Sequence, residues 1–430
     1  MSLVILPHQL YDKKYIDKNY KIVLYEHPHY FKKYNYNKKR LMLHFASMEY
    51  YKDYLKENGY KVRLIKYDKK FTLKSYDIFD PIDKIKLEGE PNILESPNFL
   101  LKMMNYEQYR KKTDKFFFNS FYMWGKKIID VIPNVKSQDK DNRKKLPKNL
   151  EIPKLPELKE TDLNYINKAQ KRVEKEFADN YGNCDDFIFP VTHKSVMSWL
   201  NNFIKHRFEK FGPYQDFIDK NNEYLFHSVL SAVINVGLLN PSDLIKVIEK
   251  FEFKIPLNSY EGFIRQLFWR EYQRYCYIYF DFKGKDFFGN KGKLGKKWYT
   301  GELGIPPVDD AIKTAFDTGY LHHINRLMVV GNYMNLSEIN PWEAFRWFME
   351  FSCDSYEWVM HQNVLDMVFF VSGGKTMRRP YMSSSNYVLK MSNYKKGDWC
   401  EVWNEKYRSF IEKHEKKLYK FRYFFKIKKK

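Results

Sequence analysis

The sequence predicts an α/β domain with a parallel sheet, followed by a larger domain that consists only of helices. In the first hundred residues, short apolar runs alternate with helical periods, an order typical of parallel sheets. A polar stretch rich in Lys and Pro follows over residues 131–160, as expected of a linker between domains. Strand patterns disappear after residue 160, and helical periods follow one another. We therefore expect domains over residues 1–130 and 161–430.

In the first domain, the apolar runs are rich in Ile, Val and Leu, and the first helical period ends at Asn58-Gly59. Strand, strand, helix and strand at these lengths indicate a parallel, Rossmann-like sheet. A later helix begins near Pro97, a residue favoured in a first helical turn. The expected strands are residues 3–6, 21–26 and 61–65, and the expected helices are residues 39–58 and 97–128.

In the second domain, apolar residues recur every three to four positions in a series of segments. The expected helices are residues 163–177, 194–209, 213–218, 222–235, 241–250, 260–280, 307–318, 320–334, 341–351 and 403–420.

The stretch 261–275 is the most informative of these helices. Its apolar residues keep a helical period, yet it also carries Arg265, Arg270 and Arg274. A helix that buries one face and bears three guanidinium groups suits a large anionic ligand. The alternative is a core helix whose arginines extend to the solvent.

Composition and charge narrow the function classes. The chain of 430 residues is 44% hydrophobic and 18% aromatic, which is ample for a folded core and excludes a disordered chain. It has 75 Lys and Arg residues against 53 acidic ones, a net charge of +22. Such a charge attracts polyanions, nucleic acid first and an acidic membrane surface second. Because the lysines are widely spread, solubility alone is the competing explanation.

The cysteines and the apolar runs indicate the compartment. The four cysteines are far apart in the sequence and form no C-x-x-C pair, so we expect neither a disulfide framework nor a metal site. No signal peptide opens the chain, and no apolar run is long enough to cross a bilayer. We expect a soluble, intracellular protein that is not bound to a membrane.

Two polar motifs are candidates for binding and chemistry. Ser228 and Ser231 lie at an expected helix start, where hydroxyl and N–H groups bind phosphate, although ordinary helix capping explains them equally. His322 and His323 are adjacent and cannot share a metal ion as histidines four residues apart do. One of them is a candidate proton donor in a cleft, and the alternative is one surface and one core histidine.

Aromatic and basic residues supply further candidates. Residues 354–367 follow no clean period and are expected to form a loop that lines a cofactor. The segment Arg378-Arg379-Pro380-Tyr381 suits contact with a DNA backbone and stacking on bases. The many tryptophans are core residues by default, but a row of them also suits electron transfer. The tail 420–430 alternates aromatic and basic residues and suits contact with nucleic acid, unless it is an ordinary frayed end.

Taken in order, these motifs resemble one family. The similar segments are Phe226-His227-Ser228-x-Leu230-Ser231, Glu261-Gly262-Phe263-Ile264-Arg265-Gln266, Trp269-Arg270-Glu271-Tyr272, Tyr299-Thr300-Gly301-Glu302, His322-His323-Ile324-x-Arg326 and Pro380-Tyr381. They resemble the cryptochrome/photolyase superfamily, in the branch of iron–sulfur bacterial cryptochromes and (6-4) photolyases. The resemblance runs over about residues 3–412.

The resemblance implies an α/β domain and a helical domain that holds FAD. It implies light-driven repair of UV photoproducts, most directly (6-4) photoproducts, in which excited reduced FAD gives an electron to a lesion flipped out of double-stranded DNA. A monomer is expected. The alternative within the family is a flavin photoreceptor or regulator without repair activity.

The resemblance also implies roles for individual residues. His322, His323 and Tyr381 are the expected catalytic residues at the lesion. Trp298, Tyr299 and Trp347 are expected to carry electrons, and Arg378, Arg379, Lys395 and Lys396 to bind DNA. The expected FAD-binding residues are Ser228, Leu230, Ser231, Glu261, Arg265, Trp269, Arg270, Asn325, Arg326, Glu357, Met360 and Asn363.

The sequence departs from the branch at three places. Ile245, Lys395 and Asp398 stand where cysteines bind a [4Fe–4S] cluster, and thiolate ligation needs the full set, so we expect no cluster. His8 replaces an aspartate that helps to bind a ribolumazine antenna in the family, which leaves open whether this chain binds an antenna. The segment before Trp269 is one residue short, and one residue corresponds to a rotation of about 100° in a helix.

Overall fold

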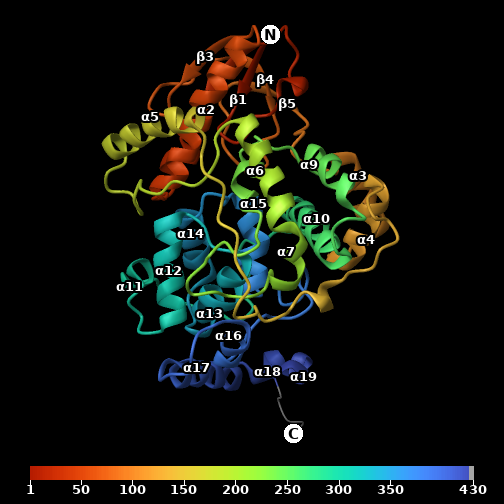
Figure 1. Ribbon diagram of the computed structural model, residues 1–430, viewed down its shortest axis with the longest axis vertical. Helices are drawn as coiled ribbons and strands as arrows, with labels where there is room; N and C mark the ends of the chain where they lie inside the picture. Colours follow the sequence, from red (N-terminus) through yellow and green to blue (C-terminus); the bar gives the residue numbers. More distant parts are fainter. Residues whose placement is uncertain (426–430) are drawn as a thin grey trace.

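The computed structural model describes residues 1–425. Figure 1 shows the α/β part at one end of the molecule, the main helical part in the middle, and helices α17 to α19 at the opposite end. Among the described residues, no helix is both long enough and apolar enough to cross a membrane.

The sheet has five parallel strands in the order β3-β2-β1-β4-β5, which confirms the predicted fold class. The three predicted strands are confirmed, and two more were not predicted. The fourth strand places Asp77 in a buried row, and the fifth contains Pro91 at the sheet edge, so neither shows an apolar run. The strands are β1 (Ser2–Ile5), β2 (Lys21–Tyr25), β3 (Lys61–Ile65), β4 (Ser75–Phe79) and β5 (Glu90–Leu94).

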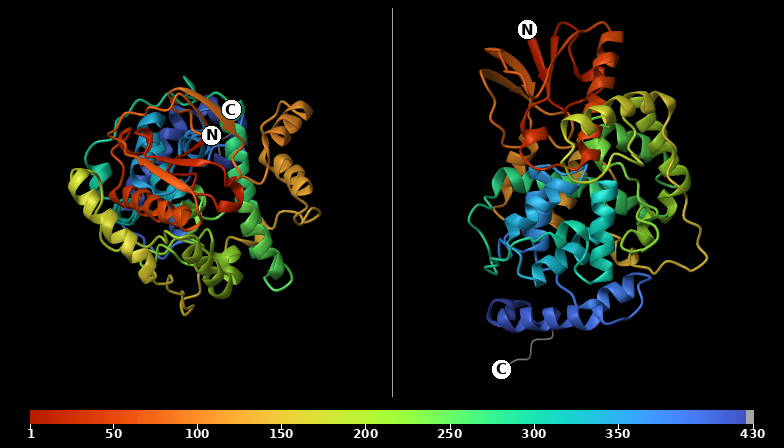
Figure 2. Two further views of the ribbon diagram at one scale, coloured as in Figure 1. Left: turned by 90° about the horizontal axis from the view of Figure 1, so that it is seen from above. Right: turned by 90° about the vertical axis from the view of Figure 1, so that its left-hand side faces the viewer.

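Helix α2 (Lys38–Glu57) packs beside the sheet, and α5 (Glu160–Glu176) packs along α2. Figure 2 shows this pair at one side of the α/β part. Arg172 of α5 donates to both oxygens of Glu26, at 2.6 and 2.8 Å. Because Glu26 directly follows β2, this bidentate pair ties α5 to the sheet. The short elements η1 (Lys13–Tyr15) and α1 (His29–Lys32) lie in the connections between strands.

The single helix expected over residues 97–128 is wrong, because the chain forms two helices there. They are α3 (Met103–Lys112) and α4 (Phe118–Ile129). Thr113 and Phe117 between them have extended backbones, and Arg110 donates to the carbonyl of Asp114 at 2.7 Å. The apolar period continues across this break, so periodicity alone did not reveal it.

The stretch over residues 131–160 has little regular structure, apart from η2 (Asp139–Asp141). It is nevertheless held against the helical part. The side chains of Asn142 and Asn258 are hydrogen-bonded, and Asn142 also donates to the Asn258 carbonyl at 3.0 Å. The N–H of Gln138 donates to Glu261 at 2.9 Å. These contacts fix the middle of the stretch in place.

The helical part is organised around α10 (Leu257–Tyr279), which is buried over most of its length. It packs against α4, α7, α15 and η5. At Gly125 of α4, an added Cβ would lie 2.7 Å from the Phe268 ring, so the close approach of α4 to α10 requires glycine there.

Three further expectations about these segments are wrong. Residues 213–218 are helical only at their first two positions, because α7 ends at Tyr214 and Ile218 forms an isolated bridge with Ser392. Residues 222–235 are helical only at their end, because Leu225 and Val229 have positive φ angles of 43° and 55°, which a right-handed helix excludes. Residues 354–367 are mainly helical and not a loop. The other elements of this part are α6 (His193–His206), α7 (Phe208–Tyr214), α8 (Ser231–Asn235), α9 (Pro241–Ile248), η3 (Glu249–Phe251), α11 (Lys297–Thr300), α12 (Pro306–Thr318), η4 (Asn325–Gly331), α13 (Asn332–Leu336), α14 (Pro341–Phe351), α15 (Glu357–Met360), η5 (His361–Val368), α16 (Ser385–Met391), α17 (Trp399–Lys413), α18 (Glu415–Leu418), η6 (Tyr419–Phe421) and α19 (Arg422–Phe425).

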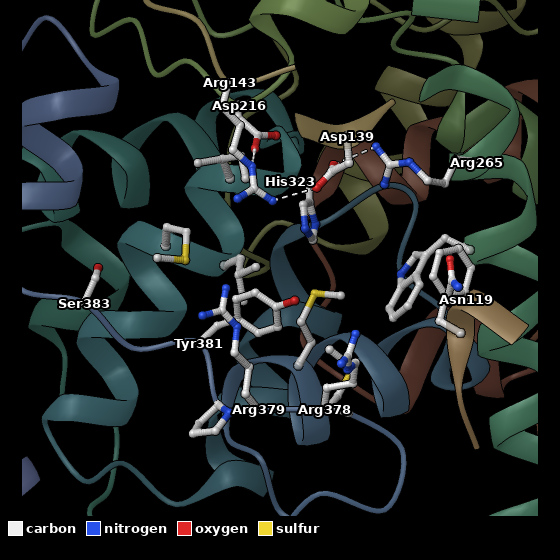
Figure 3. Close-up of a pocket in the computed structure, with 18 of the residues that line it drawn as sticks. Asn119, Asp139, Arg143, Asp216, Arg265, His323, Arg378, Arg379, Tyr381 and Ser383 are labelled. Carbon is white, nitrogen blue, oxygen red and sulfur yellow. Dashed lines mark hydrogen bonds and ion pairs between the residues drawn. The ribbon is translucent and has the colours of Figure 1, made fainter. Parts of the chain in front are cut away.

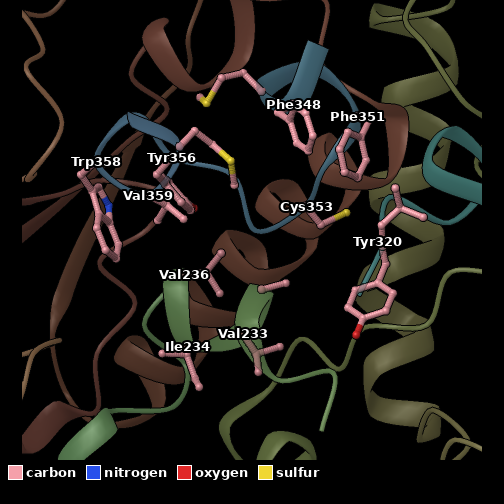
Figure 4. Close-up of a cluster of buried hydrophobic side chains, with 14 of the residues drawn as sticks. Val233, Ile234, Val236, Tyr320, Phe348, Phe351, Cys353, Tyr356, Trp358 and Val359 are labelled. Carbon is pink, nitrogen blue, oxygen red and sulfur yellow. The ribbon is translucent and has the colours of Figure 1, made fainter. Parts of the chain in front are cut away.

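One buried apolar cluster extends through both parts of the chain. Figure 4 shows a section of it, in which Val233 and Val236 of the α8 region lie near Tyr356 and Cys353. Packing of this kind fixes α8 relative to the segment that leads into α15. Both segments contribute to the site described next.

Candidate functional site

A cavity of about 550 Å³ opens in the helical part (Figure 3). Its walls come from segments that are far apart in the sequence: the start of α4, the stretch over residues 131–160, α10, η4, residues 376–387 and α19. The lining residues that carry charged or polar side chains are Asn119, Ser137, Asp139, Arg143, Gln215, Asp216, Arg265, Gln266, His323, Thr376, Arg378, Arg379, Tyr381, Ser383 and Tyr387.

A charged network lies at one side of this cavity. Asp139 accepts from Arg143 at 2.7 Å and pairs with Arg265 at 2.9 Å. The Nε atom of Arg143 is 3.4 Å from an oxygen of Asp216. Burial raises the pKa of Asp216 to about 6, although Arg143 acts in the opposite direction. The network alternates in sign, so its two arginines are not free to neutralise a ligand fully.

His323 is exposed to the cavity, whereas His322 is buried. The ring of His322 lies 4.9 Å from the ring of His227, and the backbone N–H of His322 donates to Glu223 at 2.8 Å. Burial, together with nearby Arg326 and Arg265, lowers the pKa of His323 to about 4. At neutral pH the His323 ring is therefore uncharged and carries one N–H donor. Only the second histidine of the pair is placed for chemistry in the cavity.

Arginine–aromatic pairs form part of the cavity wall. The guanidinium of Arg379 lies 5.4 Å from the Tyr381 ring and 4.2 Å from the Phe424 ring, while Arg378 lies 5.1 Å from the Phe117 ring. All five residues line the cavity. Such pairs present positive charge and flat apolar surface together.

Lys395 and Lys396 do not line this cavity. Both are exposed, in the segment that leads to α17. Their part in DNA binding stays a prediction.

A smaller cavity of about 20 Å³ lies beside the first and shares His323, Leu327 and Met367 with it. Its other lining residues include Arg326, Phe348, Met360 and Asn363. Segments η4, α14, α15 and η5 thus meet beneath the larger cavity.

Hydrogen bonds fix the polar groups around this smaller space. Arg326 pairs with both oxygens of Asp354, at 2.8 and 3.2 Å. Although burial opposes it, this pairing lowers the pKa of Asp354, which keeps that carboxylate ionised. The ring N–H of Trp269 donates to Asn363 at 3.0 Å. The sequence-predicted residues Trp269, Arg326, Met360 and Asn363 are therefore brought together.

Arg270 points away from the cavities, toward α8. It donates to the carbonyl of Asn98 at 2.6 Å and to the side chain of Asn235 at 3.0 Å, and it lies 4.3 Å from the Phe99 ring. Burial lowers the pKa of Arg270 to about 10, which still leaves it charged at neutral pH. Both hydrogen-bond acceptors are neutral, and the buried carboxyl group of Glu271 is the acidic group that acts on this guanidinium.

The residues around the start of α8 are placed differently from one another. Ser231 is exposed, and its side chain hydrogen-bonds Asp354. The Leu230 N–H donates to the Ser228 hydroxyl at 3.4 Å, and the Ser228 carbonyl accepts from Trp199 at 2.9 Å. Of the two serines, Ser231 is therefore the exposed one. The helix that it begins, α8, is linked to Arg270 by the hydrogen bond between Arg270 and Asn235.

Seven of the twelve predicted FAD-binding residues line neither cavity. They are Ser228, Leu230, Ser231 and Arg270, described above, and Glu261, Glu357 and Asn325. Glu261 accepts from Tyr122 at 2.8 Å and from the N–H of Gln138, and so holds the 131–160 stretch. Glu357 pairs with Lys33 of the α/β part. Asn325 donates to Glu223 at 3.0 Å. Their visible contacts are with protein.

The expected electron-transfer residues lie behind the smaller cavity. Phe348, which lines that cavity, packs against Trp347 with ring centroids 5.1 Å apart. Trp347 is fully buried and donates to the Trp298 carbonyl at 2.7 Å. Tyr299 is reached from Trp347 through Phe316, with ring distances of 5.5 and 5.7 Å.

Sequence reasoning missed Arg143, Asp139 and Asp216 as cavity residues, because they belong to a stretch interpreted as a linker and to the end of a helix. It also missed Phe424 and Phe425 of α19, which line the cavity. The alternation of aromatic and basic residues in the tail was the available signal. Residues 426–430 of that tail lie outside the described part of the chain.

The surroundings of His8, at the position where the resemblance left an antenna open, are closely packed. His8 follows β1, and its ring nitrogen Nε2 lies 3.0 Å from the carbonyl of Pro81, which follows β4. Its ring lies 4.6 Å from Tyr30 and 5.4 Å from Tyr356. Burial lowers the pKa of His8 to about 3. Glu26, which follows the neighbouring strand β2, is engaged by Arg172.

The four cysteines are buried and unpaired. Within residues 1–425, no group of three or more His, Cys, Asp or Glu side chains is arranged to hold a metal ion. The prediction about the iron–sulfur cluster is not tested by this finding.

Comparisons with known proteins point in one direction. A family model described as deoxyribodipyrimidine photo-lyase-related protein matches residues 3–86 and 77–189. A (6-4) photolyase of Agrobacterium fabrum is 36% identical over 261 residues, which cover 57% of this chain and 52% of that relative. The match thus spans about half of the relative's length. The uncharacterized protein R853 of Acanthamoeba polyphaga mimivirus is 49% identical over 111 residues, which cover 25% of this chain and 85% of that protein.

Two solved structures share the fold. A bacterial class III photolyase from Agrobacterium tumefaciens superposes with a TM-score of 0.62 at 14% identity, covering 91% of this chain and 86% of that one. A cryptochrome of Synechocystis sp. PCC6803 gives a TM-score of 0.59 at 12% identity, covering 97% and 88%.

Proposed function

We propose that the chain is a member of the cryptochrome/photolyase superfamily and a light-driven DNA repair enzyme that uses FAD and acts on (6-4) pyrimidine–pyrimidone photoproducts. A photolyase-related family model that matches residues 3–86 and 77–189 and a (6-4) photolyase that is 36% identical over 261 residues support this proposal. The observation that carries this proposal is the position of His323 and Tyr381 in one cavity with Arg378 and Arg379. A proton donor, an aromatic ring and cationic groups thus face a space large enough for flipped bases.

The residues beneath the cavity fit FAD. Arg270 is a desolvated cation whose hydrogen-bond acceptors are neutral, and exposed Ser231 lies in the same region; this pair suits the diphosphate of FAD. Arg326, Met360 and Asn363 meet around the smaller cavity, whose volume of about 20 Å³ holds a water molecule but not a flavin ring, so these side chains would have to move apart to bind the ring system. When bound, reduced FAD supplies the photoexcited electron. The side chains named here bind and orient it.

Charge and cavity size support damaged double-stranded DNA as the partner. The net charge of +22 favours binding to phosphates. A lesion inside a stacked duplex is out of reach of His323, so the lesion must leave the stack to enter the cavity. Arg378 is exposed beside the cavity and is placed to contact the backbone next to the extruded bases.

In the proposed reaction, the neutral His323 ring donates a hydrogen bond to the lesion, and it becomes a proton donor when the negative charge of the reduced lesion raises the pKa of the ring. This ring faces the cavity and keeps one N–H group when neutral. Tyr381 supplies a flat ring against which a flipped base stacks. The buried His322 is assigned no contact with the lesion.

A purified protein loaded with FAD and reduced tests this proposal. Under blue light, it is expected to convert oligonucleotides that contain one (6-4) photoproduct back to intact DNA, measured by chromatography. Dark samples and oligonucleotides with a cyclobutane dimer serve as controls. Normal FAD binding with unchanged (6-4) photoproduct would overturn the proposal.

The alternative is a flavin photoreceptor without repair activity. Asp139 and Asp216, which line the same cavity, favour it because carboxylates oppose a phosphate-rich ligand. In that case light would change the redox state of the bound FAD, while both kinds of lesion would stay intact.

A further inference from the structure

Two aromatic side chains near the end of the described chain are unusually exposed. Tyr423 and Phe424 of α19 have 84% and 57% of their surface exposed. Large aromatic side chains normally bury most of their surface. Exposure of two in succession beside a cavity indicates a surface for binding.

This exposed pair is held in place by its neighbours. Phe425 is 8% exposed. Phe421 packs against Phe370, with ring centroids 5.4 Å apart. Lys420 donates to the carbonyl of Gly373 at 2.8 Å. The segment is therefore anchored on both sides of Tyr423 and Phe424.

One member of the pair, Phe424, lines the cavity that the proposed function uses, and Tyr423 precedes it on α19. Phe425 also lines this cavity, and Figure 1 shows α19 at the end of the molecule opposite the sheet. The Arg379 guanidinium lies 4.2 Å from the Phe424 ring. A strand whose base enters the cavity therefore has Phe424 beside its path.

Charge around the pair selects the kind of partner. The Arg422 guanidinium lies 4.9 Å from the Tyr423 ring and 4.9 Å from the Tyr419 ring. Exposed aromatic rings interleaved with cations are typical of surfaces that bind unpaired nucleic acid, where bases stack and phosphates meet positive charge. A second copy of this chain, with its charge of +22, would be repelled by the same groups.

We propose that Tyr423 and Phe424 form a stacking platform for the DNA strand that enters the cavity. Their side chains point about 100° apart on α19, and each ring stacks on an unpaired nucleobase. The proposal rests on the proposed function, because it takes DNA as the ligand of the cavity. Arg422 contacts a phosphate of a stacked nucleotide. Base stacking on the platform holds the strand open beside the extruded lesion.

DNA binding in the dark tests the platform without any need for repair. The probes are an undamaged duplex with a short internal bubble of unpaired bases and the same duplex fully paired, with binding followed by fluorescence anisotropy of a label. The variants are Tyr423→Ala, Phe424→Ala and the double variant. Tyr423→Phe keeps the ring, and Phe253→Ala removes an aromatic side chain that is 96% exposed and does not line the cavity.

Each alanine variant is expected to bind the bubble duplex about tenfold more weakly, within the range measured for loss of one stacked base. The affinity of the same variants for the fully paired duplex is expected to fall much less. The dependence of the DNA-binding constant on salt concentration is expected to stay unchanged, because these variants remove no Lys or Arg side chain. Tyr423→Phe and Phe253→Ala bind like the unmodified protein.

Two outcomes overturn the platform. One is a double variant that binds the bubble duplex as tightly as the unmodified protein. The other is an equal loss on both duplexes, because that would place the rings against the backbone or in the fold. A protein that fails to repair (6-4) photoproducts but shows the bubble-specific loss would retain the platform and refute the repair function, so the two failures are distinguishable.

Discussion

His322 and His323 are neighbours in the sequence, yet they have different surroundings. His322 is 2% exposed and packs against His227, whereas the His323 ring faces the cavity. In a helical segment, successive side chains point about 100° apart, which accounts for the difference. His322 is thus placed to stabilise the fold, whereas the next residue, His323, is placed for chemistry in the cavity.

Replacement of each histidine by alanine is expected to separate these roles. His322→Ala leaves a buried gap and is expected to lower the free energy of unfolding by about 2 kcal/mol. His323→Ala removes a ring from the cavity wall and is expected to leave that free energy nearly unchanged. Urea unfolding of both variants measures the difference, and a larger loss for His323→Ala would contradict it.

At the scale of elements, α10 connects three regions through its three arginines. Arg265 meets Asp139 at the cavity, Arg270 reaches α8, and Arg274 pairs with Asp80 of the α/β part at 3.1 Å. The sequence pattern indicated an anionic ligand for such a helix. The structure places only the first of the three on the larger cavity and gives the third a structural partner.

The contact between α4 and α10 is tight enough to test by substitution. In Gly125→Ala, the new Cβ would lie 2.7 Å from the Phe268 ring. Overpacking of this kind is expected to lower the free energy of unfolding by about 1–3 kcal/mol, despite the higher helix propensity of alanine. Gly295→Ala, with no atom within 4 Å of the added Cβ, is the matched control.

A second substitution checks the cause. Phe268→Leu in the Gly125→Ala background is expected to recover part of the lost stability, because the smaller side chain makes room. Thermal and urea unfolding both report this. A Gly125→Ala protein as stable as the Gly295→Ala control would show that the two helices are not in close contact.

Helix α14 carries the row of rings that leads from the smaller cavity. Trp347→Phe is expected to slow the photoreduction of bound FAD by an external thiol under blue light, because phenylalanine is much harder to oxidise than tryptophan. Trp342→Phe changes a tryptophan on the same helix that is 38% exposed and lines neither cavity. Absorbance of oxidised FAD follows both, and equal rates would contradict the route through Trp347.

At the scale of the whole molecule, the sequence predicted the order of the layers better than the site. The first three strands and most helices could be predicted from the spacing of their apolar residues, because each element has to bury one face in the core. The edge strand β5 and the break between α3 and α4 leave no such period. The cavity joins residues as distant as Arg143 and Tyr381, and no local pattern reveals which separate segments will meet.

The fold also determines how stability depends on pH. Ten of the eleven histidines have lowered pKa values, with burial as the first cause. Six carboxyl groups have raised pKa values, again through burial; they are Asp83, Asp216, Glu223, Glu271, Glu350 and Asp366. The two sets affect the free energy of unfolding in opposite directions: the histidines lower it as the pH falls, and the carboxyl groups lower it as the pH rises.

Stability is expected to be greatest near pH 6.5. Between about pH 6.5 and 4.5, the unfolded chain binds protons on histidines that stay neutral in the fold, and these outnumber the protons on buried carboxyl groups. Each excess proton removes about 1.4 kcal/mol per pH unit as the pH falls. Above pH 6.5, Asp83 and Glu223, with pKa values of about 8, lose protons that they hold only in the fold, so stability falls again.

Urea unfolding at a series of pH values between 4.5 and 8.5 measures this profile. A free energy of unfolding that rises steadily from pH 6.5 to 4.5 would contradict the neutral burial of the histidines. His206, which is exposed at the end of α6, offers the control: His206→Gln should leave the profile unchanged.

The central claim is that the cavity with His323 is the site of light-driven repair. The most direct measurement compares the unmodified protein with His323→Ala, both loaded with FAD and reduced, on a DNA duplex with one (6-4) photoproduct under blue light. The account predicts that the unmodified protein restores the intact bases, while the variant binds FAD and the damaged duplex but repairs it at least about a hundredfold more slowly, as expected for loss of a proton donor. Equal repair by both proteins, or none by the unmodified protein, would contradict it.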